Sequence, residues 1–95
     1  QLFGAVEGSG LRVDRAGGTF IAAGNLCNWH IDVDFYDRSQ TRYYHVQGQN
    51  NSGCSRTGGE KYNLNGFRAR PGRACIRLYR DFGNEGLASV CHGIH

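Results

Sequence analysis

Four cysteines are the feature that most restricts how this chain can fold. They stand at positions 27, 54, 75 and 91 of 95 residues. A chain of this length buries a modest core, so covalent cross-links supply a large share of its stability. The spacings lack the C-x₂₋₄-C pairs of zinc sites and favour disulfides, which persist in oxidising compartments. We therefore predict one disulfide-bonded domain, residues 1–95, that is secreted and holds no metal or other cofactor.

A strict alternation of apolar and polar residues follows the first cysteine. One face of residues 27–36 collects the apolar side chains, namely Cys27, Trp29, Ile31, Val33 and Phe35. The other face carries Asn28, His30, Asp32, Asp34 and Tyr36. A period of two residues with one apolar face predicts a half-buried β-strand over Cys27–Tyr36, with Trp29 in the core. Asp37–Gln40 predicts a turn, and Arg42–Gly48 predicts a returning strand.

The same pattern bears on the disulfide connectivity, for which four cysteines allow three possibilities. If Cys27 lies opposite Cys54 in an antiparallel register, Phe35 falls opposite Val46 and Asp34 opposite Gln47. Apolar residues then meet apolar residues, whereas a shift by one residue would turn Val46 toward water. This match favours a Cys27–Cys54 bridge.

The last two cysteines show a similar symmetry about Gly83. If Cys75 lies opposite Cys91, Ile76 meets Val90 and Leu78 meets Ala88. Apolar positions again coincide, which favours a Cys75–Cys91 bridge over the other two connectivities.

The rest of the chain shows no helical period and predicts further short strands. The expected strands are Leu2–Val6, Leu11–Arg15, Thr19–Ala23, Cys27–Tyr36, Arg42–Gly48, Lys61–Ala69, Arg73–Arg80 and Leu87–His92. The sequence contains no run of about 18 apolar residues, so no membrane-spanning helix is predicted. The predicted fold class is all-β: a small antiparallel β-sandwich or barrel with two disulfides.

Charge and aromatic residues suggest a binding surface in the second half of the chain. Residues 1–50 carry four arginines against five acids, whereas residues 51–95 carry seven basic residues against three acids. Six tyrosines and phenylalanines between Tyr43 and Phe82 are more than one small core can take up. Tyrosine and arginine are typical of interface hot spots and also bind polyanions. The predicted binding residues are Tyr62, Arg68, Arg70, Arg77, Tyr79 and Arg80, and the predicted partner is a protein, a polyanion or another macromolecule of a host or competitor.

The acids and histidines raise two alternatives, a cation site and a catalytic site. Asp32, Asp34 and Asp37 lack the spacing of a calcium loop, so we expect solvated carboxylates on an outer face. A ribonuclease would need His30 or His45 beside an arginine, and the sequence does not show that they meet. We expect the histidines to lie at the surface without a catalytic role.

The pattern LCNWHIDVDFYD…SGCSRTG…GRACIRLYRD…VCHGI resembles small secreted four-cysteine proteins of filamentous fungi, described as effector-like or killer-toxin-like. Similar chains occur in soil actinobacteria. The resemblance covers residues 26–94 and implies a secreted β-rich protein that acts outside the cell. The predicted function is therefore non-enzymatic binding, of effector, toxin or antimicrobial type. A small secreted ribonuclease and an inhibitor of a secreted hydrolase are the alternatives.

Overall fold

The computed structural model describes all 95 residues and consists of strands joined by turns and short loops. The six strands are β1 (Leu2–Ser9), β2 (Arg12–Asp37), β3 (Arg42–Val46), β4 (Asn51–Arg68), β5 (Gly72–Arg80) and β6 (Glu85–Ile94). All neighbouring strands pair antiparallel. The predicted all-β class is confirmed, and the structure contains no helix that could span a membrane.

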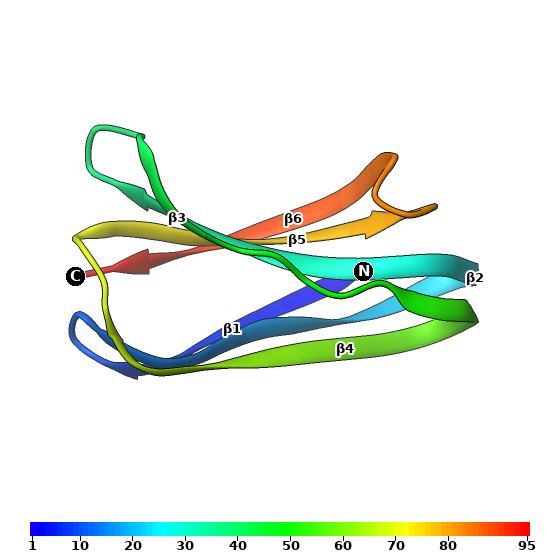
Figure 1. Ribbon diagram of the computed structural model, residues 1–95, viewed down its shortest axis with the longest axis horizontal. Helices are drawn as coiled ribbons and strands as arrows, with labels where there is room; N and C mark the ends of the chain where they lie inside the picture. The colour runs from blue at the N-terminus through cyan, green and yellow to red at the C-terminus, as the bar shows by residue number, and fades with distance from the viewer.

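The 26-residue strand β2 belongs to two layers (Figure 1). Its first part lies between β1 and β4 and forms the lower layer. From His30 onward it lies between β3 and β5, and β6 extends this upper layer beyond β5. The change occurs next to Asn28, whose φ of 53° lies in the left-handed region that asparagine tolerates better than most residues. One strand thus takes part in both layers of the sandwich.

The core lies between the two layers and is lined by every second residue of β2. Ile31, Val33 and Phe35 are completely buried, and β5 adds Ala74, Ile76 and Leu78 from the same layer. Val13, Ala16 and Phe20 face them from the lower layer. Trp29 is 7% exposed and meets the Phe20 ring edge-on at 4.8 Å, so its predicted place in the core is confirmed.

Both predicted disulfides are present. Cys27 pairs with Cys54 across β2 and β4, and Cys75 pairs with Cys91 across β5 and β6. The register predicted around the second bridge is confirmed, because Ile76 lies opposite Val90. It holds from Gly72 to Leu78 and then shifts next to Tyr79.

The register predicted around the first bridge is wrong by two residues. Val46 lies opposite Val33 rather than Phe35, and Asp34 lies opposite His45 rather than Gln47. The reason is that the return to Cys54 is not one strand: β3 ends at Val46 and β4 begins at Asn51. A shift by two keeps each side chain on its predicted face, so the apolar match could not detect it.

Three expected strands between Leu11 and Tyr36 are instead one continuous strand, and β4 begins ten residues before the expected Lys61. Gly17 and Gly18 suggest a turn in the sequence, yet both lie in extended β2. A Cβ atom at Gly17 would lie 2.0 Å from the Glu60 carbonyl oxygen, and one at Gly18 would lie 2.9 Å from that of Phe3. These glycines therefore permit close strand approach and do not break the strand.

Candidate binding surface

The outer face of the upper layer holds a dense cluster of ionisable side chains, here called the polar face. Because odd-numbered residues of β2 point into the core, the even-numbered ones point to the opposite side. Strand pairing adds residues of β3 and β5 beside them. The polar face comprises His30, Asp32, Asp34, Tyr36, Arg42, His45, Arg73, Arg77 and Tyr79.

Asp34 lies at the centre of the polar face and is only 2% exposed. One carboxylate oxygen accepts hydrogen bonds from His45 Nδ1 and, at 3.3 Å, from the Arg42 guanidinium. The other accepts from Arg77 Nε at 3.0 Å. Burial alone would raise the pKa of Asp34, but the hydrogen bonds from His45 and Arg77 outweigh it and lower the pKa below its ordinary value. Asp34 is thus a buried, ionised acid.

Asp32 is 5% exposed and connects β2 to the segment after β3. Its Oδ1 accepts a hydrogen bond of 2.8 Å from the Gly48 backbone N–H. His30 Nε2 lies 3.3 Å from the same oxygen, and His45 Nε2 lies 3.6 Å from Oδ2. The bond to Gly48 holds the chain beside β2 after regular pairing has ended.

His45 has an acceptor at each ring nitrogen. Nδ1 faces Asp34, and Nε2 lies 3.0 Å from the Gln47 side-chain oxygen. These contacts with Gln47 and Asp34 raise the pKa of His45, because an imidazolium can donate from both nitrogens. His45 therefore binds a proton more readily than a free imidazole does.

The expectation of solvated acids and surface histidines is wrong for much of this cluster. Asp32, Asp34 and His30 are all buried, and His30 stacks on Tyr79 with ring centroids 4.9 Å apart. Arginines of β3 and β5 cover Asp34, and His45 and the Gly48 backbone cover Asp32; this cross-strand cover is not visible in the local alternation. Asp37 is the last residue of β2, and its carboxylate accepts backbone hydrogen bonds from Ser39 and Thr41, just beyond the strand.

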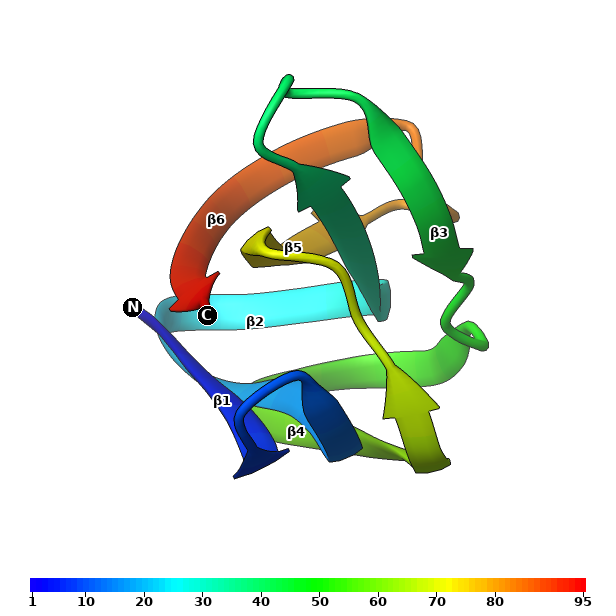
Figure 2. The ribbon, with the colours of Figure 1, turned by 90° about the vertical axis from the view of Figure 1, so that its left-hand side faces the viewer.

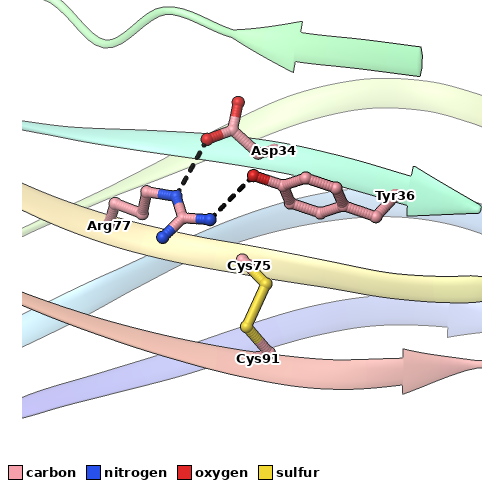
Figure 3. The surroundings of a disulfide bond; sticks show 5 residues. All are labelled: Asp34, Tyr36, Cys75, Arg77 and Cys91. Carbon is pink, nitrogen blue, oxygen red and sulfur yellow. Dashed lines mark hydrogen bonds and ion pairs between the residues drawn. A yellow bond between two sulfur atoms is a disulfide. The ribbon is translucent and has the colours of Figure 1, made fainter. Parts of the chain in front are cut away.

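Three arginines gather around one tyrosine at the β2–β3 end of this face. Arg77 donates to Asp34 and, at 2.8 Å, to the Tyr36 hydroxyl, which links the two residues of β2 (Figure 3). The Arg73 guanidinium lies over the Tyr36 ring, 4.9 Å from its centroid. Arg42 lies opposite Tyr36 on β3. We call Tyr36, Arg42, Arg73 and Arg77 the arginine–tyrosine patch.

The patch keeps hydrogen-bond donors for a ligand. Arg42 and Arg73 are exposed, and Arg73 makes no side-chain hydrogen bond within the protein. Arg42 uses one guanidinium nitrogen on Asp34, and Arg77 uses two of its three nitrogens. A guanidinium presents five N–H groups, so several donors remain unoccupied.

Of the six predicted binding residues, the structure brings only Arg77 and Tyr79 together on this face. Arg68 lies on β4 opposite Arg12, and Arg70 lies over the Tyr43 ring at 4.6 Å. Arg80 forms an ion pair with Glu85 at 2.9 Å. Tyr62 is half-buried; its hydroxyl donates to the Ile31 carbonyl at 2.6 Å, and burial raises its pKa to about 12. These four residues do not share one surface.

Sequence reasoning missed Tyr36, Arg42 and Arg73 as members of the patch. The signal that could have found them is cross-strand register, because Tyr36 lies opposite both Arg42 and Arg73. The expectation that surplus aromatic residues reach the surface is met by Tyr44 and Phe82, which are 41% and 70% exposed.

No group of three or more histidine, cysteine, aspartate or glutamate side chains has an arrangement that could hold a metal ion. Comparisons with models of known protein families, with curated proteins and with solved structures find no match to this chain. The case for a function therefore depends on the geometry and chemistry of the polar face.

Proposed function

We propose that this chain is a secreted, non-enzymatic protein that binds a negatively charged macromolecule outside the cell through the arginine–tyrosine patch. An effector, toxin or antimicrobial role fits such binding. The two disulfides support an oxidising, extracellular setting, because such bonds rarely persist in a reducing cytosol.

One observation carries the proposal: guanidinium groups converge on an exposed face in excess over the acids beneath them. The polar face has three arginines, Arg42, Arg73 and Arg77, against the two carboxylates Asp32 and Asp34. Guanidinium groups bind phosphate, sulfate and carboxylate oxygens through paired N–H donors. The Tyr36 ring lies under the Arg73 guanidinium and holds it at the surface beside Arg42.

The acid–base groups favour binding over catalysis. A general base must present a free lone pair to its substrate. Asp34 is almost completely buried and occupied by three donors, and both ring nitrogens of His45 already face protein acceptors. These residues are therefore suited to hold the arginines in place.

Binding can be tested with two labelled polyanions, a heparin oligosaccharide and single-stranded RNA, by fluorescence anisotropy at several salt concentrations. We expect salt-dependent binding, weakened about tenfold or more by Arg73→Glu. Arg56→Glu is the matched control, since Arg56 is exposed on β4 in the lower layer and the net charge changes equally. Equal loss in both variants, or no salt-dependent binding to either probe, would contradict the proposal.

A secreted ribonuclease remains the second candidate, because the structure places His45, Asp34 and Arg77 in one cluster. A phosphate bound by Arg77 would then lie near a histidine, as acid–base cleavage of RNA requires. Incubation of the oxidised protein with RNA decides between the two. We expect no cleavage beyond that of a His30→Ala/His45→Ala double variant; cleavage abolished by that variant would establish an enzyme.

A further inference from the structure

One sequence motif lies outside the polar face and takes no part in the proposed binding. Asn50, Asn51 and Ser52 form an asparagine–x–serine tripeptide, which is the acceptor motif for N-linked glycosylation. None of the other six asparagines is followed two residues later by serine or threonine. Because so short a motif also occurs by chance, the structure around it is needed to judge whether an oligosaccharide can be attached there.

The motif begins in an exposed loop. Residues 47–50 follow β3 without regular structure, and no backbone–backbone hydrogen bond involves them. Asn50 and Ser52 are both exposed, and neither side chain makes a hydrogen bond within the protein. Figure 2 shows this loop at the outer edge of the molecule, beside the start of β4. The amide and the hydroxyl that define the motif are therefore both open to solvent.

The middle residue of the motif is held in place. Asn51 is half-buried and lies opposite Trp29 of β2. Its side-chain amide donates hydrogen bonds to the carbonyl oxygens of Trp29, at 3.3 Å, and of Gln49, at 3.2 Å. These contacts fix the start of β4 to β2 and leave the residues on either side of Asn51 exposed.

We propose that Asn50 is an acceptor for an N-linked oligosaccharide. The inference rests on the secretion proposed above, because this modification is made during passage through a eukaryotic secretory pathway. The donor is a lipid-linked oligosaccharide diphosphate. A bond forms between the Asn50 side-chain nitrogen and the anomeric carbon of the first sugar, and the bond from that carbon to the diphosphate oxygen breaks. The lipid diphosphate leaves, and the amide releases one proton.

An oligosaccharide at Asn50 would leave the arginine–tyrosine patch open. Asn51 lies opposite Trp29, whereas the patch is centred on Tyr36, seven residues further along β2. At about 3.3 Å per residue, these two positions on β2 are about 23 Å apart. Figure 1 shows the start of β4 and the β2–β3 turn toward opposite ends of the molecule. The oligosaccharide and a bound polyanion would therefore occupy separate parts of the surface.

The experiment is expression of the full chain in a eukaryotic cell line behind a cleavable signal peptide, followed by mass spectrometry of the protein purified from medium and cells. We expect a mass increase of one oligosaccharide, removed by an amidase that cleaves N-linked glycans. Asn50→Gln and Ser52→Ala should each abolish the increase, and Ser52→Thr should retain it because threonine also completes the motif. Asn84→Gln is the matched control and should retain it, since Asn84 is exposed in the turn before β6 and lies outside any such motif.

A wild type that carries no oligosaccharide would overturn the proposal, and so would a mass increase that persists in Asn50→Gln. A binding measurement separates this inference from the proposed function. The glycosylated wild type and Asn50→Gln should bind the heparin oligosaccharide with the same dissociation constant; weaker binding by the glycosylated form would contradict the separation of the two sites. No binding by either form would contradict the proposed function, whereas the mass would still establish the modification of Asn50.

Discussion

The two faces of the second half of β2 are both buried, but by different interactions. On the core face, Ile31, Val33 and Phe35 are 0% exposed because they pack between the two layers. On the polar face, Asp32 and Asp34 are nearly as inaccessible because side chains of β3 and β5 and the backbone at Gly48 cover them. Burial of the first face is favoured by the hydrophobic effect, whereas burial of the second depends on complete pairing of charge. The polar side of an alternating strand is therefore not necessarily exposed to solvent.

The largest expected effect comes from the core face. Phe35→Ala should lower the free energy of unfolding by about 3–5 kcal/mol, because it removes a fully buried ring and leaves a cavity. Urea denaturation of the oxidised protein measures this change. A loss below about 1 kcal/mol would show that the interior collapses around the missing ring.

The central acid of the polar face should come next. Asp34→Ala should lower the free energy of unfolding by about 2–3 kcal/mol, since it leaves the Arg77 and His45 donors without their buried acceptor. The effect should be smaller than that of Phe35→Ala because Arg77 and Arg42 retain access to water. The same denaturation experiment measures it; a variant as stable as the wild type would contradict the role given to Asp34.

The polar face should also make stability depend on pH, and the core face should not. The pKa of His45 is raised above its ordinary 6.5, so its contribution is present below pH 6.5 and is lost as pH rises through the higher folded value. The pKa of Asp34 is lowered from 3.8, so its contribution is present above pH 3.8 and is lost as pH falls through the lower folded value. The cluster should therefore stabilise most between about pH 4 and 6.5.

Thermal unfolding measured from below pH 3.8 to well above pH 6.5 checks both directions. His45→Gln should remove the decline on the alkaline side and weaken the decline on the acid side, which Arg77 still maintains by lowering the pKa of Asp34. His95→Gln is the control, because His95 is exposed at the end of the chain. An unchanged alkaline decline in His45→Gln would assign that decline to another group.

The smallest stability change is expected at the rim of the patch. Arg73→Ala should cost less than about 1 kcal/mol, because an exposed cation–π contact contributes little. Its effect on polyanion binding should be larger than its effect on unfolding. Comparison of the two measurements would separate a ligand-binding arginine from a structural one such as Arg77.

Much of the fold could be predicted because it follows from local periodicity. The alternation in residues 27–36 predicts a strand with Trp29 inside, and the apolar match about Gly83 predicts the register of β5 and β6; both are confirmed. The register of β3 was not recoverable, because a shift by two residues preserves the faces. The continuity of β2 through Gly17 and Gly18 depends on close approach of β4 and β1, which no local pattern contains.

The sequence predicted which types of residue form the candidate site, but not which individual residues belong to it. A surplus of arginine and tyrosine is visible in the sequence, but Tyr36, Arg42 and Arg73 come from three strands and meet only through their register. The excess of basic residues in the second half of the chain predicted a binding surface there, apart from the acids of the first half. In the structure, those acids hold the arginines in place.

The sequence alone determined that this chain forms antiparallel strands, which residues face the core and which cysteines are joined, because period-two alternation and cysteine symmetry are properties of neighbouring residues. Only the tertiary structure decided that β2 would serve two layers and that Asp32 and Asp34 would be buried beneath polar groups from other parts of the chain. Coulomb attraction and hydrogen bonding act between side chains that are far apart along the chain. Which side chains become partners is set only when the strands adopt their register.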